Sequence, residues 1–353
     1  MVIKIDKSNK FVKSEVIMKK FNYYIFVPWG ESGGPEGLHQ LCYELINLGE
    51  NAHMIYYDSS RDRIQKEYRD KICGRYNQYE GVTSFTPNYI SDIDTEDSLI
   101  VLPEICTINH IKKFKKAKVL FLRLSNNTKE TARDPWNYDS LYDPVFKTCY
   151  TACDPFLIFN MIKNSKSYDM EKVFALRPNI NFSYLTSEKE LDDLKNKRKN
   201  VVMYNPARGI EHFYKIIEES KNIDLDIDIE FIPLQGMNQI ELRSIMDTSK
   251  LYIELGDLPG PDRLPRECAS RGSVILLGKR GSGLDWDDFP IEEKIDYNQS
   301  NNTFNYESIC YSIVDMIKNY DYYYEKQKSF REILRNEREI YINQIKKMIE
   351  IIK

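Results

Sequence analysis

Apolar residues in the first part of the chain form two kinds of run. The segment 23–29, YYIFVPW, has almost no polar interruption, which is typical of a strand buried on both faces of a sheet. After the glycine-rich turn 30–37, GESGGPEG, apolar residues recur at helical spacing until Gly49 predicts the end of a helix. A second strand, AHMIYYD, follows over 52–58. This strand–loop–helix–strand unit predicts the start of a parallel sheet.

A second series with the same alternation follows the charged stretch 186–200 and ends in the apolar strand SVILLG. The two series predict an α/β protein with two Rossmann-like domains that face a cleft, an N-terminal domain over 1–185 and a C-terminal domain over 186–325. The segment 326–353 predicts an amphipathic closing helix packed on one of the domains. Its apolar stripe consists of Leu334, Tyr341, Ile345, Met348 and Ile352.

Composition narrows the classes of protein. Of the 353 residues 42% are hydrophobic and 29% charged, and the net charge of −4 gives no electrostatic argument for nucleic-acid binding. The seven cysteines form no CxxC motif and are expected to be idle thiols in a reducing cytosol. No run approaches the roughly 20 apolar residues that span a bilayer, and the N-terminus lacks a signal-peptide core. We therefore expect a cytoplasmic protein.

Gly33 and Gly34 lie between a predicted buried strand and a helix start. Backbone N–H groups at such a turn, together with the positive end of the helix dipole, suit a phosphate or an anionic sugar. A tight turn alone would also explain two glycines. The spacing is not G-x-G-x-x-G and no P-loop is present, which disfavours NAD binding and ATPase activity.

The segment 203–213, MYNPARGIEHF, leads from a strand through Asn205 and Arg208 into a helix. A cation at a helix start opposes the helix dipole. Its position is explained if Arg208 neutralises a diphosphate held at the same edge of the sheet. A solvated surface arginine is the alternative.

The segment 256–283 contains Asp262, Arg263, Arg266 and Glu267 within six positions. Because Arg263 and Arg266 are three residues apart, we expect both to project from one helical turn toward the same ligand. Glu267, placed at a helix start, is expected to accept hydrogen bonds from two ribose hydroxyls. The alternative is a capping carboxylate with salt-bridged arginines.

With these segments the chain resembles GT-B glycosyltransferases of surface-polysaccharide gene clusters, over about residues 22–297. The resemblance rests on SGGPEGLHQL, VLPE, LRLS, YNPARG and PGPDRLPRECASRGSVILLGKRGSG. It implies a nucleotide sugar in the C-terminal domain and a saccharide or lipid-linked acceptor in the N-terminal domain. It also implies that Glu267 binds the ribose and that Arg208 binds phosphate. Many retaining members carry a second glutamate eight positions earlier, where this chain has Pro259.

We expect a transfer that needs neither a metal nor a cofactor beyond the nucleotide sugar. Arg208, with Arg263 or Arg266, would stabilise the negative charge that develops on the leaving diphosphate. An inverting reaction also needs a base for the acceptor hydroxyl. Glu36 beside the glycine turn is the first candidate, and Glu104 at a strand end is the second.

Some signals are expected to mislead. Asp-x-Asp triplets at 92–94 and within 224–228 are typical of metal-dependent transferases, but their loop and strand-edge settings favour no metal role. The run KKFKKAK at 112–118 predicts the solvent-exposed face of a helix. The mildly basic C-terminal helix leaves open a peripheral contact with the inner face of the membrane. His39 either faces the cleft or is a satisfied, semi-buried side chain.

Two other functions stay open at this level. A sugar-nucleotide epimerase of related architecture would turn over a nucleotide sugar with no acceptor present. A catalytically inactive GT-B-like binding subunit would be supported if nucleotide sugars failed to raise the thermal stability of the protein.

Overall fold

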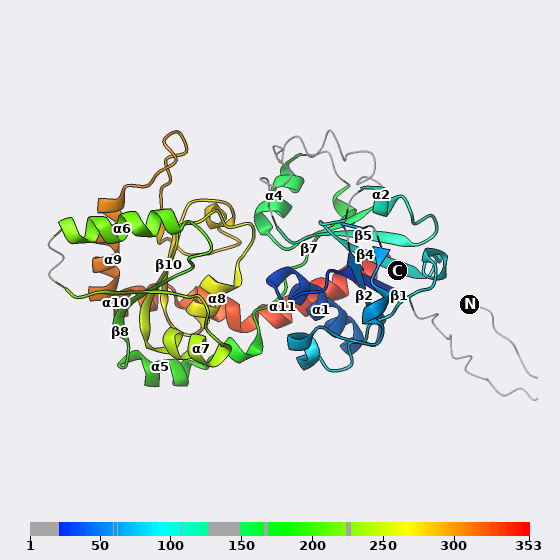
Figure 1. Cartoon of the computed structure of the whole chain (residues 1–353), viewed down its shortest axis with the longest axis horizontal. Coiled ribbons are helices and arrows are strands. Elements are labelled where there is room, and N and C mark those ends of the chain that lie inside the picture. The colour runs from blue at the N-terminus through cyan, green and yellow to red at the C-terminus, as the bar shows by residue number, and fades with distance from the viewer. Residues whose placement is uncertain are drawn as a thin grey trace, which may run out of the picture.

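The computed structural model describes residues 21–58, 60–61, 63–106, 108–125, 149–165, 169–223 and 227–353. Two lobes lie side by side along the long axis of the molecule (Figure 1). In the described residues the N-terminal lobe holds a seven-stranded sheet and the C-terminal lobe a five-stranded sheet. The predicted α/β fold with two Rossmann-like domains is confirmed, whereas the domain limits at 185 and 325 stay predictions.

The N-terminal sheet has the strand order β3-β2-β1-β4-β5-β6-β7. Neighbouring strands are parallel except β2 and β3, which pair antiparallel at one edge. The central strands are continuous apolar runs because helices and loops cover both faces of the sheet. The strands are β1 (Asn22–Val27), β2 (Asn51–Asp58), β3 (Arg63–Ile64), β4 (Ser98–Pro103), β5 (Lys118–Arg123), β6 (Tyr150–Cys153) and β7 (Val173–Ala175). The helices of this lobe are α1 (Gly33–Asn47), α2 (Ile108–Ile111) and α4 (Phe156–Ser165).

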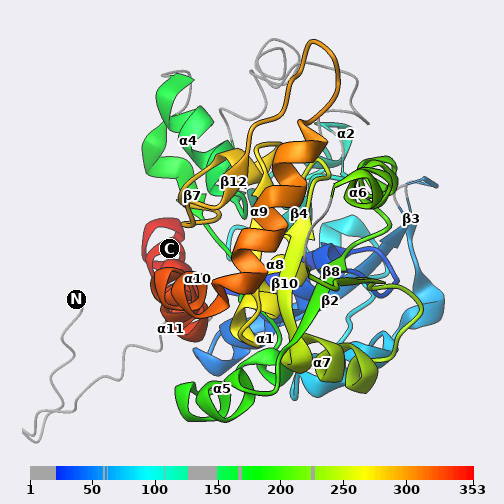
Figure 2. The same ribbon diagram turned by 90° about the vertical axis from the view of Figure 1, so that its left-hand side faces the viewer.

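The C-terminal sheet has the order β12-β11-β10-β8-β9, with all neighbours parallel. Figure 2 places this lobe in front; helices α6, α9 and α10 pack on one face of the sheet, and α7 and α8 on the other. The strands are β8 (Lys199–Tyr204), β9 (Glu230–Pro233), β10 (Ser249–Glu254), β11 (Val274–Gly278) and β12 (Lys294–Ile295). The helices are α5 (Glu188–Lys195), α6 (Ile210–Asn222), α7 (Gln239–Thr248), α8 (Arg263–Ser270), α9 (Tyr306–Lys318) and α10 (Tyr320–Lys326).

Short 3₁₀ turns connect several of these elements. They are η1 (Lys66–Tyr68), η2 (Gly74–Gln78), η3 (Ile90–Asp92), η4 (Met170–Lys172), η5 (Phe182–Tyr184) and η6 (Ser282–Leu284). No helix in the described part of the chain has the length and apolar character that a bilayer span requires.

The last helix, α11 (Lys328–Ile352), passes from one lobe to the other (Figure 1). Its first half places Phe330 and Leu334 in the core of the C-terminal sheet. Its second half places Tyr341 and Ile345 in the core of the N-terminal sheet. The amphipathic helix is therefore as predicted, but the expectation that it packs on only one domain is wrong, since its apolar stripe is long enough to contact both cores.

Candidate functional site

Each sheet has a point where the chain reverses its direction of travel across the strands. In the N-terminal sheet the chain passes from β1 to β2 and then crosses to β4 on the other side of β1. In the C-terminal sheet it passes from β8 to β9 and crosses to β10 on the other side of β8. Ligands of open α/β sheets bind outside the carboxyl ends of the strands at such switch points. The loops after β1, β4, β8 and β10, here called the interdomain site, therefore define the first place to look for function.

The two switch points contact each other through side chains of Glu36 and Arg263. A guanidinium nitrogen of Arg263, at the start of α8, lies 2.7 Å from the Glu36 carboxylate in the first turn of α1. A Cβ atom placed on Gly33 would lie 3.8 Å from Nε of Arg263, so the glycine turn faces the other domain at close range. A Cβ on Gly34 would instead meet Leu124 at 3.4 Å. The sequence-predicted turn thus lies at the domain boundary.

The Glu36 side chain is fully buried. Besides Arg263, its carboxylate accepts hydrogen bonds from the hydroxyl of Tyr79 at 2.9 Å and from the side-chain amide of Asn181 at 3.3 Å. An acceptor hydroxyl could reach this carboxylate only after the ion pair with Arg263 has opened. The role of Glu36 as a base stays a prediction that requires such opening.

Glu104 follows β4 directly and serves the turn after β5. Its carboxylate accepts hydrogen bonds from the backbone N–H groups of Leu124 and Ser125, both at 3.1 Å, and from the Ser125 hydroxyl at 2.6 Å. Burial raises the pKa of the Glu104 carboxyl, and the hydrogen bonds from Ser125 oppose that rise. These contacts give Glu104 a positioning role in the turn, and its predicted role as a base stays untested.

Arg208 and Asp262 join the two loops of the C-terminal switch point. The Arg208 guanidinium forms an ion pair with the Asp262 carboxylate, and both side chains are partly exposed. Burial raises the pKa of the Asp262 carboxyl, while the charge of Arg208 acts in the opposite direction. A Cβ atom on Gly256 would lie only 2.6 Å from Cβ of Arg208, so glycine is required for the two loops to approach this closely.

Asn205 forms the turn that leads to Arg208. Its side-chain oxygen accepts a hydrogen bond from the backbone N–H of Ala207 at 3.0 Å. Gly209 is the N-cap of α6 and has a φ of 68°, a left-handed conformation that glycine adopts without strain. The strand, turn and basic helix start that the sequence predicted are all present, so Arg208 is held at the carboxyl end of β8.

The two arginines of α8 do not converge on one point, and that expectation is wrong. Arg266 points into the protein, where it is 3% exposed and donates to both carboxylate oxygens of Glu337 on α11, at 3.0 and 2.6 Å. It also donates to the backbone oxygens of Pro261 and Pro178. The Glu337 carboxylate on α11 draws this side chain inward, whereas Arg263 faces the N-terminal domain. A contact between Arg266 and a donor would require these bonds to break.

Glu267 lies in the second turn of α8, because the helix begins at Arg263 rather than just before the glutamate. The side chain is 7% exposed. The prediction that Glu267 lies at the helix start is therefore wrong, because Asp262 occupies the N-cap. Ribose binding by Glu267 stays a prediction.

Asp154 is a residue of this region that sequence reasoning missed. It follows β6 directly, and its backbone N–H donates to the carbonyl oxygen of Arg123 at 2.8 Å. Its Oδ1 atom is buried without a hydrogen-bond partner among the described residues. Burial raises the pKa of Asp154 from 3.8 to about 7, although Arg177 and Arg266 oppose the rise. The sequence signal that could have identified Asp154 is its position directly after the apolar run YTAC.

Several other sequence signals have structural explanations. His39 is fully buried, with Nδ1 2.6 Å from the Pro35 carbonyl oxygen and Nε2 2.8 Å from the Tyr56 hydroxyl. Burial lowers its pKa to about 4, so it is a satisfied core histidine.

The carboxylate of Asp94, in the first Asp-x-Asp triplet, accepts hydrogen bonds from the backbone N–H groups of residues 115–117. Part of the second triplet lies outside the described residues. All seven cysteines are buried.

No group of three or more His, Cys, Asp or Glu side chains is placed to hold a metal ion within the residues that the structure describes. The charged groups at the interdomain site are arginine and carboxylate side chains, arranged as the ion pairs Arg208–Asp262 and Arg263–Glu36.

No protein-family model matches the sequence, and no curated protein matches it either. Solved structures of similar fold include a glycosyltransferase from Rickettsia africae, at 14% identity and a TM-score of 0.58, with 95% of this chain and 98% of that chain covered. HepE from Anabaena, crystallised with UDP and glucose, has 10% identity and a TM-score of 0.60 over 94% and 99% of the chains. Sucrose-phosphate synthase from Thermosynechococcus elongatus has 10% identity and a TM-score of 0.63 over 94% and 98%. The likeness spans both lobes and shows that the chain has the GT-B fold implied by its motifs.

Proposed function

We propose that this protein is a glycosyltransferase that moves a sugar from a nucleotide sugar to a saccharide or lipid-linked acceptor in polysaccharide synthesis in the cytoplasm. The observation that carries the proposal is the direct contact between two switch points, made by Glu36 and Arg263. A donor bound at one switch point and an acceptor at the other would meet at this contact. Because HepE was crystallised with UDP and glucose, UDP-sugars are the first donors to test.

Arg208 is the best placed cation for the donor diphosphate. It lies at the carboxyl end of β8, its side chain is 32% exposed, and it forms an ion pair with the Asp262 carboxylate of the neighbouring loop. A diphosphate that replaced this carboxylate would accept a charge-assisted hydrogen bond from Arg208. It would also be stabilised by the positive end of the dipole of α6, whose N-terminus is nearby. Asn205 holds the turn, and Glu267 is proposed for the ribose.

Arg263 links donor binding to the candidate base. We propose that Arg263 exchanges the Glu36 carboxylate for a diphosphate oxygen when the donor binds. This exchange would stabilise the leaving group and release Glu36 to accept the proton of an acceptor hydroxyl. Gly33 and Gly34 are proposed to let the donor approach the backbone at the start of α1 closely. The proposed transfer uses these groups and no metal ion.

A thermal-shift screen with UDP-, GDP-, CMP- and dTDP-sugars tests the donor proposal. One class of nucleotide sugar is expected to raise the melting temperature of the wild-type protein. Arg208→Gln should weaken that ligand about tenfold or more, since one charged contact is lost. The matched control is Arg61→Gln, which removes an exposed arginine paired with Asp58 at 3.5 Å. Equal shifts in wild type and Arg208→Gln would contradict the site.

Product analysis separates the remaining functions. A transferase consumes the donor faster when an acceptor is added, whereas an epimerase converts the nucleotide sugar alone. An inactive binding subunit would bind the donor and give neither product. Consumption of donor without acceptor, with an isomeric nucleotide sugar as product, would replace the transferase proposal by the epimerase.

A further inference from the structure

A separate cavity of about 220 Å³ lies within the N-terminal domain. Its floor includes Phe26 of β1, Tyr57 of β2 and Leu102 of β4, each the last or next-to-last apolar side chain of its strand. The cavity therefore lies near the carboxyl ends of these strands, the same edge of the sheet that carries the glycine turn and Glu104. All of its described lining residues belong to the N-terminal domain, so it is distinct from the loops after β8 and β10.

The cavity combines aromatic walls with cationic side chains. Phe26, Tyr57 and Phe114 are buried, whereas Tyr89 is 72% exposed and lies at the rim. The cations among its lining residues are Arg63, Lys66 and Lys113. No described lining residue carries a carboxylate.

Carboxylates lie close by, outside the lining. Asp92 accepts the backbone N–H of Tyr89 at 3.0 Å, and Asp58 pairs in register with Arg63. Glu67 approaches Arg63 at 3.9 Å, but both side chains are about half exposed, and such a pair is weak in water. The described lining itself holds three cations and no carboxylate, so the inner surface of the cavity is positive and apolar. Few polar groups over an apolar floor are typical of a small-molecule pocket, and Arg and Lys supply strong hydrogen bonds to phosphate.

We propose that this cavity binds a phosphate group carried by the acceptor, with the adjoining sugar or lipid body packed against the aromatic walls. The inference rests on the proposed transferase function and names the class of its acceptor. The volume suits a phosphate and about one ring, less than a drug-sized ligand. Leu102 in the floor is two residues from Glu104, so an acceptor anchored here would extend along β4 toward the interdomain site.

Two probes distinguish a soluble sugar phosphate from a lipid phosphate. The first is glucose 1-phosphate, measured by calorimetry against uncharged glucose. The second is a phosphatidylcholine vesicle containing a polyprenyl phosphate, measured by co-sedimentation against vesicles without it. We expect one probe to bind, and saturating UDP should not displace it.

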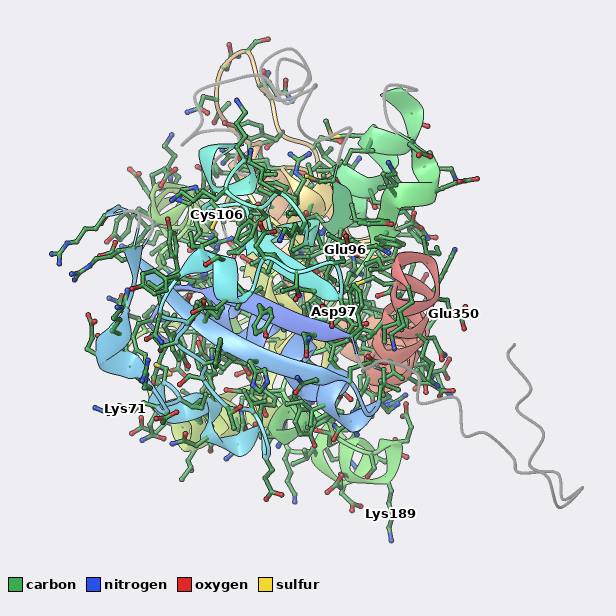
Figure 3. The ribbon with its side chains drawn as sticks, turned by 90° about the vertical axis from the view of Figure 1, so that its right-hand side faces the viewer. Lys71, Glu96, Asp97, Cys106, Lys189 and Glu350 are labelled. Carbon is green, nitrogen blue, oxygen red and sulfur yellow. The ribbon has the colours of Figure 1, made fainter. Side chains whose placement is uncertain are left out.

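Lys66→Gln should weaken the bound probe about tenfold, and Tyr89→Ala should also weaken it. The control is Lys71→Gln, at an exposed lysine outside the cavity lining, which Figure 3 shows at the border of the N-terminal lobe. This variant should bind like the wild type. The proposal is overturned if neither probe binds, if UDP displaces the probe, or if Lys66→Gln and Lys71→Gln bind it equally. Thermal shifts with nucleotide sugars should be the same in both variants, so a failure of the donor proposal would be seen separately.

Discussion

At the scale of single residues, the charged groups at the domain boundary are paired within the protein. A buried guanidinium or carboxylate is costly unless an opposite charge or hydrogen bonds compensate it. Each arginine predicted for the donor therefore has a carboxylate partner within the protein. The pairs are Arg208–Asp262, Arg263–Glu36 and Arg266–Glu337. A ligand that binds here must exchange partners, which makes binding sensitive to protonation.

Binding of the donor should take up protons at Asp262. Burial raises the pKa of this carboxyl and Arg208 lowers it, so a diphosphate that takes Arg208 away lets the pKa rise further. The affinity for the nucleotide sugar should then increase as the pH falls. Calorimetry in two buffers of different ionisation enthalpy should report net proton uptake, and Asp262→Asn should remove it. Proton release on binding would contradict the exchange of partners.

The wild-type protein should lose stability as the pH rises through about 7, and Asp154→Asn should lose less. The folded-state pKa of about 7 lies above the ordinary value of 3.8, so folded protein holds this proton more tightly than the unfolded chain. The stabilising contribution of Asp154 is complete below about pH 4 and is lost as the pH rises through about 7.

Urea unfolding at about pH 5 and about pH 8 measures this effect of Asp154. Between the two pH values the wild type should lose about 1–3 kcal/mol more than Asp154→Asn, because a group with a raised folded-state pKa costs up to about 1.4 kcal/mol per pH unit up to that pKa. The same difference between variant and wild type at both pH values would show that the Asp154 carboxyl does not titrate in this range.

At the scale of elements, one buried ion pair connects three segments of the chain. Arg266 on α8 pairs with Glu337 on α11, and Glu337 also accepts the backbone N–H of Ile180 at 3.2 Å. Arg266 donates in addition to the carbonyl oxygen of Pro178. The pair thus fixes α8 and α11 against the segment that connects the two sheets.

Glu337→Gln should lower the free energy of unfolding by about 3–5 kcal/mol, because it leaves the Arg266 charge buried without its partner. The double variant Arg266→Met, Glu337→Leu should recover most of this loss, since no buried charge remains. Urea denaturation measures both, with Glu339→Gln on the exposed side of α11 as the control. A cost for Glu337→Gln as small as that for Glu339→Gln would show that the pair contributes little.

The elements could be predicted where the signal is local. The run 23–29 predicted β1, and the stripe in 326–353 predicted α11, because strands buried on both faces and amphipathic helices have characteristic apolar patterns. The partner of Arg266 lies 71 residues away in sequence, so no spacing within 256–283 could show which way its side chain points. The sequence does show the cluster of charged residues in 256–283. Tertiary packing decides that Arg266 joins a buried ion pair whereas Arg263 faces the interdomain site.

At the scale of the whole molecule, the two lobes are joined by α11 and by ion pairs across their boundary. Glu36 pairs with Arg263, and Arg177 of the N-terminal lobe pairs with Asp288 of the C-terminal lobe. The first pair lies at the proposed point of transfer, whereas the second consists of buried side chains beside α4. Donor binding is therefore expected to change the first contact and leave the second, together with α11, as the permanent connection.

Glu36→Gln and Arg263→Gln test whether this contact sets the separation of the lobes. Both variants remove the ion pair, so both should increase the radius of gyration in small-angle scattering and accelerate hydrogen exchange at the start of α1. If Glu36 is also the base, Glu36→Gln should lower turnover at saturating donor by about 10²–10⁴-fold. Arg263→Gln should mainly raise the KM for the donor. Near-normal turnover of a folded Glu36→Gln would leave Glu36 with its interdomain contact alone, and the base would then have to be sought elsewhere, beginning with Glu104.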